Sequence, residues 1–170
     1  MVDQIRSLYL TNDRTLTSIT TTLLPHLRWV NDPTIAAVAD AEGDVTLASE
    51  RLPSLVTAPP AEFGGPGDRW SPETLLIGAL ADCFILTFRA IARASKVSWI
   101  SLRCEVEGTL DRVERVTQFT EFVVRASLQL PAGANEEQAH RLLERAEQSC
   151  LISNSLKGAS RLEATVAVQA

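Results

Sequence analysis

The sequence predicts an α+β fold in which antiparallel sheets surround a long central helix. Residues 98–110 and 118–130 alternate apolar and polar side chains, as half-buried antiparallel strands do. Residues 71 to about 95 are apolar on nearly every side, which is typical of a buried helix. With shorter strands before and after, the expected order of elements is β-β-α-β-β-α-β.

The N-terminal part of the chain is expected to contain an arm, a hairpin and a loop. Residues 1–33 fit the rest poorly, and we interpret them as an N-terminal extension of uncertain structure. Residues 34–58 are expected to form a β-hairpin, because apolar runs at 34–39 and 45–48 flank a segment of turn composition with Gly43. Three prolines and three glycines exclude regular structure from residues 58–70 and predict a long ordered loop.

The central helix has clear start signals. Ser71 is expected at the N-cap and Pro72 at the first helical position, and the charge of Glu73 suits the helix dipole. The helix should end near Ser95 or Lys96. A domain of this size cannot easily bury such an apolar helix alone, so a dimer that wraps two of them together is expected.

The C-terminal part supplies a second helix and a closing strand. Asn135 is expected to cap the helix, with Gln138 three residues later, and Cys150 closes its apolar stripe. Residues 161–169 alternate again and predict the last strand.

The amino-acid composition limits the classes of function that the protein could have. Hydrophobic residues make up 45% and charged residues 22% of the 170 residues, the net charge is −5, and the pI is about 5.1. These values are typical of a soluble globular protein and argue against nucleic-acid or membrane partners. We expect no membrane span and no signal peptide, so three cysteines indicate a reducing cytoplasm. The two histidines, His26 and His140, are too few to favour hydrolysis or a zinc site, and no metal or cofactor is expected.

The cysteines carry the leading functional hypothesis. Cys83 lies within the apolar central helix, and Cys150 lies at the end of the second helix, just before Leu-Ile-Ser-Asn-Ser. Two thiols on separate helices indicate a pair that could be joined and parted, which is typical of thiol redox chemistry. Cys104 falls on the apolar face of a strand, and we interpret it as a small core residue.

Several motifs in this order resemble the OsmC/Ohr family, the osmotically inducible protein C and organic hydroperoxide resistance proteins. They are Phe63-Gly-Gly-Pro-Gly, Ser71-Pro-Glu-Thr-Leu-Leu, Ala81-Asp-Cys-Phe and Cys150-Leu-Ile-Ser-Asn-Ser. The similarity covers residues 34–170 as a single domain. It implies an OsmC/Ohr-like fold, an intertwined homodimer in which two sheets enclose two long central helices.

The resemblance also implies a thiol-dependent peroxidase that reduces organic hydroperoxides to alcohols in oxidative-stress defence. Cys83 would be the peroxidatic cysteine and Cys150 the resolving one, joined after turnover in a disulfide. The implied partners are an organic hydroperoxide as substrate and a dithiol reductant, such as a lipoylated protein. Cytoplasmic location is expected.

Peroxide reduction requires a thiolate, and burial in an apolar helix raises a thiol's pKa, so a nearby arginine held by a carboxylate is needed. Glu73 matches the family's carboxylate, but it precedes Cys83 by ten residues, about 15 Å of helix rise. We therefore expect it to act across a dimer interface or through a bridging arginine. Neither position where the family carries its arginine holds one here. Arg69 is our first substitute and Arg51 our second.

Two other functions stay open. An OsmC-like protein without the arginine could bind an apolar small molecule without turnover. A thiol-based sensor of oxidants acting through a partner protein is the third option. The peroxidase and the binding protein are separated by whether an arginine guanidinium contacts the Cys83 sulfur.

Overall fold

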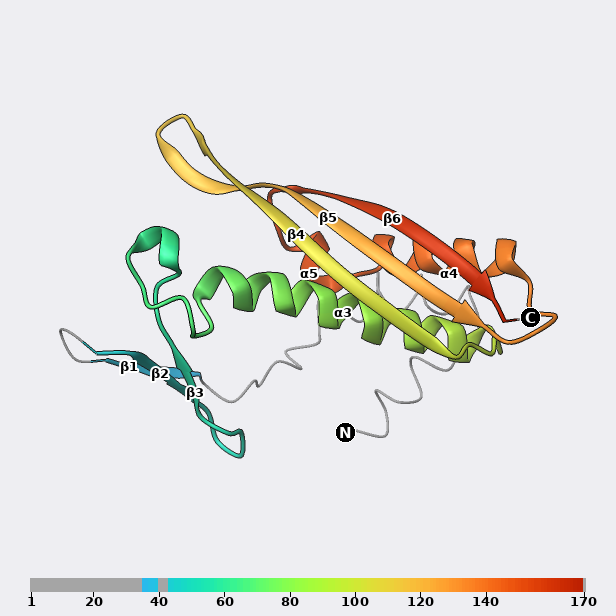
Figure 1. Cartoon of the computed structure of the whole chain (residues 1–170), viewed down its shortest axis with the longest axis horizontal. Helices are drawn as coiled ribbons and strands as arrows, with labels where there is room; N and C mark the ends of the chain where they lie inside the picture. The colour runs from blue at the N-terminus through green and yellow to red at the C-terminus, as the bar shows by residue number, and fades with distance from the viewer. Residues whose placement is uncertain (1–34, 40–42, 170) are drawn as a thin grey trace, which may run out of the picture. The chain divides into compact units, whose positions relative to one another are not determined.

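The computed structural model describes residues 35–39 and 43–169, so the predicted extension at 1–33 and part of the first hairpin turn lie outside the described residues. The described residues belong to two compact units, one ending at Leu76 and one beginning at Ile77. The elements, labelled in Figure 1, are β1 (Ala36–Val38), β2 (Val45–Ala48), β3 (Leu55–Thr57), the 3-10 turn η1 (Ala61–Phe63), α3 (Pro72–Ala94), β4 (Ser101–Val113), β5 (Val116–Leu130), α4 (Glu136–Gln148), α5 (Leu151–Asn154) and β6 (Ala159–Val168).

The first unit contains a small antiparallel sheet in the order β1-β2-β3. The predicted hairpin is confirmed by the pairing of β1 with β2, but the third strand, β3, was not predicted. Three residues are too short to show alternation, so β3 left no periodic signal. The buried Thr57 ends this strand, and its hydroxyl donates to the Val45 carbonyl at 3.3 Å.

The predicted loop at residues 58–70 is ordered and closed at its ends. The Ala58 N–H donates to the Trp70 carbonyl at 3.0 Å, and the Gly65 N–H donates to the Pro60 carbonyl at 3.0 Å. A Cβ added at Gly65 would lie 1.7 Å from the Pro59 carbonyl oxygen, so only glycine fits there. The expectation of no regular structure is wrong for η1 alone, a single tight turn.

Helix α3 starts as predicted. Ser71 and Thr74 form a reciprocal cap, in which the Thr74 N–H donates to Ser71 Oγ at 3.2 Å and the Ser71 N–H to Thr74 Oγ1 at 2.8 Å. Threonine thus fills the role that glutamate or glutamine usually has in a capping box. The helix ends at Ala94, close to the expected end, and Lys96 turns the chain with a φ of 54°.

The second unit contains the sheet β4-β5-β6. Strands β4 and β5 form the predicted antiparallel pair, joined by a turn in which Glu114 and Arg115 both have positive φ. Strand β6, however, runs parallel to β5, so the sheet is mixed and not wholly antiparallel as expected. The connection through α4 and α5 explains this, because a parallel return needs a crossover of a dozen or more residues.

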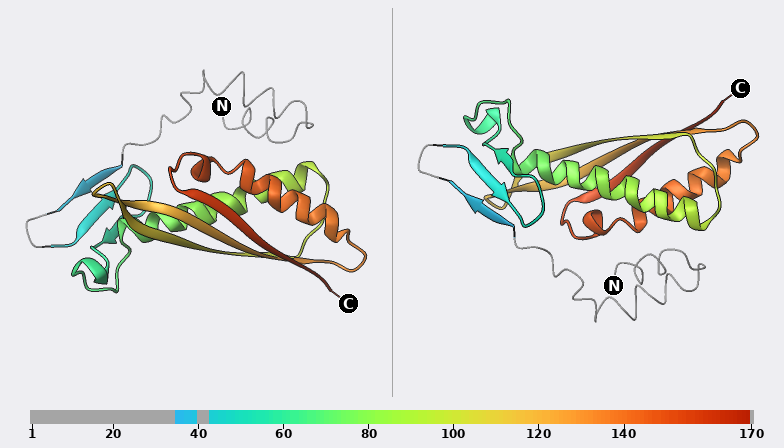
Figure 2. Two further views of the ribbon diagram at one scale, coloured as in Figure 1. Left: turned by 90° about the horizontal axis from the view of Figure 1, so that it is seen from above. Right: turned by 90° about the horizontal axis from the view of Figure 1, so that it is seen from below.

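The core of the second unit lies between this sheet and the helices. Figure 2 shows α3 and α4 along the same face of the sheet. The buried side chains on the sheet are Phe122, Val124, Ala126, Leu128 and Leu130, and those on the two helices include Leu80, Phe84, Phe88, Ala139, Leu143 and Ala146. The predicted α+β class and central helix are therefore confirmed.

Helix α3 buries one stripe of its apolar surface within the described chain. Leu80, Phe84 and Phe88 are at most 1% exposed, whereas Leu86, on another face, is 50% exposed. Among the described helices, α3 alone is long and apolar enough to cross a membrane by length and composition. Its buried stripe makes it the core helix of this unit.

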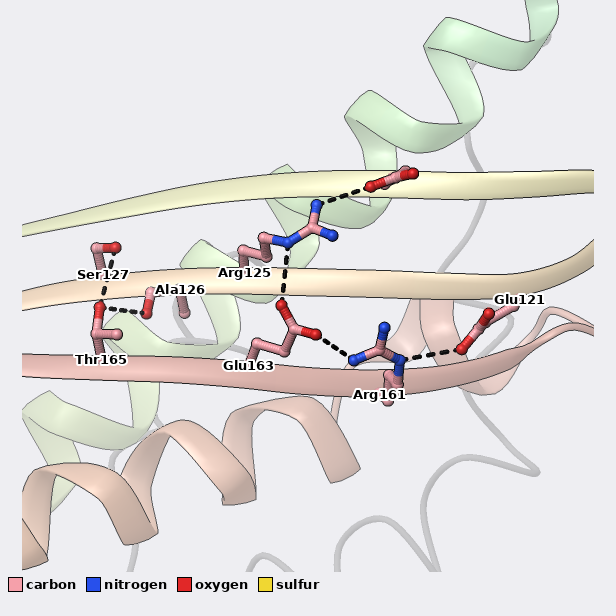
Figure 3. A network of polar contacts seen from close by, with 8 residues as sticks. Glu121, Arg125, Ala126, Ser127, Arg161, Glu163 and Thr165 are labelled. Carbon is pink, nitrogen blue, oxygen red and sulfur yellow. Dashed lines mark hydrogen bonds and ion pairs between the residues drawn. The ribbon is translucent and has the colours of Figure 1, made fainter.

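The outer face of the sheet carries a ladder of ion pairs (Figure 3). Arg125 bridges Glu107 at 2.8 Å and Glu163 at 3.0 Å, while Arg161 pairs with Glu163 and with Glu121. Val123 lies on this outer face in register with Glu107 and Arg161, and it is only 6% exposed. The ladder therefore covers an apolar side chain, and we assign it a structural role.

Candidate functional site

Cys83 lies on α3 beside the buried stripe of that helix. Phe84, the next residue, is 1% exposed, and Cys83 itself is half-buried. The helix thus places Cys83 at the border of the core, less buried than its apolar sequence environment suggested. Cys83, Cys104 and Cys150 are all free thiols.

Cys150 caps the four-residue helix α5 and does not belong to α4, which ends at Gln148. This corrects the prediction that Cys150 closes the apolar stripe of α4. The chain leaves the helix at Ser149, and the extended backbone of Cys150 turns its side chain into the core, where the residue is 1% exposed.

Cys83 on α3 lies close enough to Cys150 to affect its titration. Burial raises the pKa of Cys150 from 9.0 to about 11, the backbone N–H of Ser153 lowers it, and Cys83 raises it further. A negative charge on Cys83 opposes removal of the proton from Cys150.

Cys104 interacts electrostatically with Cys150. It is half-buried on β4, and burial raises its pKa from 9.0 to about 11, with a further contribution from the charged form of Cys150. Its position on the apolar face was predicted, but its proximity to Cys150 was not. The alternation of β4 shows which face a residue occupies, whereas the neighbours across the core depend on the packing of α5.

We expect these two buried thiols to destabilise the protein at alkaline pH. Because the pKa values of Cys104 and Cys150 are raised on folding, the folded state holds their protons more tightly than the unfolded state. Their contribution to stability is complete below about pH 9 and is lost as the pH rises toward about 11. Urea unfolding at a series of pH values measures this. The alkaline loss should be smaller in Cys104→Ala, and an equal loss would contradict the prediction.

Glu73 lies in the first turn of α3, within the unit that ends at Leu76. One of its carboxylate oxygens, Oε2, is buried and has no hydrogen-bond partner among the described residues. The cap of the helix is formed by Ser71 and Thr74, so Glu73 is not needed there. A buried carboxylate oxygen without a hydrogen-bond partner is energetically costly.

Both candidate arginines lie in the same unit as Glu73. Arg69 pairs with Asp68 at 3.0 Å and with Asp44 at 3.5 Å, and its side chain is 43% exposed. Arg51 is exposed in the turn after β2, with a φ of 65°. Asp44 belongs to the acidic hairpin turn, which is one of the positions without the expected arginine. This turn therefore supplies one ion-pair partner of Arg69.

A comparison with known protein families gives a match that spans most of the candidate site. The model of the family described as OsmC-like protein matches residues 65–165. This range is more than half of the chain and includes Arg69, Glu73 and all three cysteines. The chain belongs to the OsmC family.

Curated relatives of this OsmC-family protein have different names. It is 32% identical over 127 residues to the uncharacterized protein YmaD of Bacillus subtilis, covering 73% of this chain and 84% of the relative. It is 26% identical over 125 residues to an organic hydroperoxide resistance protein of Xanthomonas axonopodis pv. citri, covering 72% and 84%.

Solved structures confirm the OsmC fold. An organic hydroperoxide resistance protein OsmC from Legionella pneumophila superposes with a TM-score of 0.65 at 26% identity, covering 82% of this chain and 98% of that one. An OsmC-like protein of unknown function from Vibrio cholerae has a TM-score of 0.66 at 18% identity, covering 78% and 99%. The predicted OsmC/Ohr-like fold of the single chain is therefore correct, and the intertwined homodimer stays a prediction.

Proposed function

We propose that this protein is a thiol-dependent peroxidase that reduces organic hydroperoxides to alcohols. The proximity of Cys83 to the buried Cys150, whose pKa it helps to raise, is the observation that carries the proposal. A thiol pair at the edge of an apolar core, in a chain 26% identical to organic hydroperoxide resistance proteins, fits this chemistry better than it fits a structural role.

In the proposed reaction, the Cys83 thiolate attacks one peroxide oxygen, the O–O bond breaks, and the alcohol leaves after taking a proton. Cys83 is then a sulfenic acid, and Cys150 condenses with it to form a disulfide and release water. A dithiol reductant, of which a lipoylated protein is one candidate, restores both thiols by exchange. The apolar residues around Cys83, such as Phe84, favour a bulky organic peroxide over hydrogen peroxide. The cytoplasm is the proposed compartment, because its reducing conditions keep unreacted thiols free.

We also propose a homodimer in which Glu73 acts at an active site across the dimer interface or through a bridging arginine. Two observations support it: the exposed apolar surface of α3, including Leu86, and the buried Glu73 oxygen without a partner in the described chain. A second copy of the chain would cover the exposed apolar surface of α3. It would also bring a cation to the buried Glu73 oxygen. Arg69 is the proposed cation that activates Cys83, with Arg51 as the alternative.

The alternative function is binding of an apolar small molecule without turnover. The pairing of Arg69 with Asp44 and Asp68 favours it, because an arginine neutralised by two carboxylates has less charge to offer a thiolate. Both functions use the same apolar site, and they differ in whether a hydroperoxide oxidises Cys83.

Stoichiometric oxidation with cumene hydroperoxide, followed by peptide mapping, tests the proposal. We expect one cumyl alcohol per disulfide formed and a Cys83–Cys150 linkage as the first product. Thiols that stay unchanged would reject peroxidase activity and support the binding function.

A further inference from the structure

Helix α3 carries a second stripe of side chains on the side opposite its buried stripe. Leu86 is 50% exposed, whereas Phe84 and Phe88, which lie about 200° around the helix from it, are at most 1% exposed. Successive members of this second stripe are separated by three, four, three and four positions, the spacing that keeps side chains on one side of a helix. All of them are exposed, and we call them the exposed stripe: Ala79, Asp82, Leu86, Arg89 and Arg93.

The charged side chains of the exposed stripe have no ion-pair partner among the described residues. Asp82 and Arg89 are seven residues apart, which is about 10 Å of helix rise, and they do not pair with each other within the chain. On the outer face of the sheet, by contrast, Arg125 and Arg161 each pair with two carboxylates. The stripe therefore presents an exposed leucine between an unpaired negative charge and an unpaired positive one.

A second copy of the chain matches this pattern when the two helices run antiparallel and cross at Leu86. Asp82 precedes Leu86 by four residues and Arg89 follows it by three, which is about 6 Å and about 4.5 Å along the helix axis. A two-fold axis at Leu86 therefore places Asp82 within about 1.5 Å, along the axis, of the partner's Arg89, and it repeats the contact on the other side. Ala79 and Arg93 are each seven residues from Leu86, so an arginine faces the smallest side chain of the stripe.

Other pairings of the two stripes fit less well. In a parallel pair, Asp82 would face Asp82 and Arg89 would face Arg89, so like charges would repel at both positions. Moving the antiparallel crossing point by one turn would place either two Asp82 or two Arg89 side chains at the crossing. A crossing between Leu86 and Arg89 would pair Asp82 with the partner's Arg93, but it would pack the Arg89 guanidinium against the leucine. The crossing at Leu86 alone joins opposite charges and apolar surface at once.

We propose that the exposed stripe is the contact by which two copies of this chain recognise each other, as an antiparallel pair of α3 helices centred on Leu86 with two Asp82–Arg89 ion pairs. The inference rests on the homodimer of the proposed function, and it adds the register and the residues that select it. It does not depend on the reaction of Cys83 with a peroxide. The apolar surface around Leu86 supplies contact area, whereas the ion pairs exclude other registers, because like charges placed together at an interface are costly.

Charge-reversal variants test the register. In a homodimer of Asp82→Arg, or of Arg89→Asp, like charges face each other at both contacts, so each variant alone should dimerise at least about tenfold more weakly than wild type in sedimentation analysis. When the two variants are co-expressed, one with a small tag, the new arginine of one chain faces the new aspartate of the other. Native mass spectrometry should then show more than about nine-tenths heterodimer, against the one half expected for random pairing. The double variant Asp82→Arg/Arg89→Asp should dimerise as wild type does.

Two further pairs of variants are the controls. Glu136→Arg and Lys157→Glu change the net charge by the same amounts at exposed positions outside the stripe, so together they should pair at random. Asp82→Arg combined with Arg93→Asp should give less heterodimer than Asp82→Arg combined with Arg89→Asp. An equal or larger share with Arg93→Asp would overturn the register.

The outcomes separate this inference from the rest of the proposed function. Random pairing of Asp82→Arg with Arg89→Asp, in a protein whose wild type dimerises, would overturn the register and leave the homodimer standing. A wild-type chain that stays monomeric at micromolar concentration would overturn both. Neither measurement uses a peroxide, so a failure of peroxidase activity would leave the expected pairing unchanged.

Discussion

Replacing Cys83 with serine should lower the rate of cumene hydroperoxide reduction by at least about a thousandfold, to that of the uncatalysed reaction. A serine hydroxyl stays protonated at neutral pH and does not form a sulfenic acid, so the first step has no nucleophile. The rate is measured as alcohol formed in the presence of a dithiol reductant. The side chain differs by one atom and Cys83 is half-buried, so an unchanged thermal transition would show that the loss is chemical.

Cys150→Ser is the matched variant, because it removes the other thiol of the pair and leaves Cys83 in place. It should still form one alcohol per chain, since the Cys83 thiol remains. Sustained turnover should fail, because the sulfenic acid has lost its partner and becomes open to further oxidation. The reverse pattern, with activity retained in Cys83→Ser and the first step lost in Cys150→Ser, would exchange the two roles.

Gly65→Ala should reduce the free energy of unfolding by on the order of 3 kcal/mol, because the new Cβ collides with backbone that cannot move independently. The Cβ would lie 1.7 Å from the Pro59 oxygen and 2.5 Å from the Pro59 carbonyl carbon. The Gly65 N–H is hydrogen-bonded to Pro60, so the clash can be relieved only by opening the loop. Urea denaturation followed by circular dichroism measures the change.

Gly64→Ala is the neighbouring control. A Cβ at Gly64 meets nothing within 4 Å, and the cost there comes only from its φ of 83°. That left-handed conformation should cost alanine about 1 kcal/mol. Equal destabilisation by the two substitutions would show that the close contact at Gly65 contributes nothing.

Local signals predicted those elements whose sequence pattern is long or whose caps are specific. The start of α3 followed from Ser71 and Pro72, and the start of α4 from Asn135, whose side chain accepts from the Gln138 N–H at 2.9 Å. Strands β4 and β5 are long enough for their alternation to be unambiguous. Strand β3 and helix α5, of three and four residues, are too short to carry a period.

The candidate site was predicted in part. The motifs singled out Cys83, Cys150 and Glu73, and Arg69 was chosen as a substitute for the arginine that the motifs lack. All four lie within the range matched by the OsmC family model. The roles of all four residues stay predictions. The direction of β6 was wrong, because alternation is the same in parallel and antiparallel strands, and pairing depends on the crossover through α4.

The sequence by itself determined the α+β class, the central helix, the closed glycine loop and the family, since these depend on local chemistry and on motifs in a fixed order. The tertiary structure decided which thiols meet. It took Cys150 out of α4 and made it the cap of α5, next to Cys83 and near Cys104. It also left a Glu73 oxygen buried without a partner in the described chain. These relations join residues far apart in sequence, and they depend on how helices pack against a sheet, which no local pattern encodes.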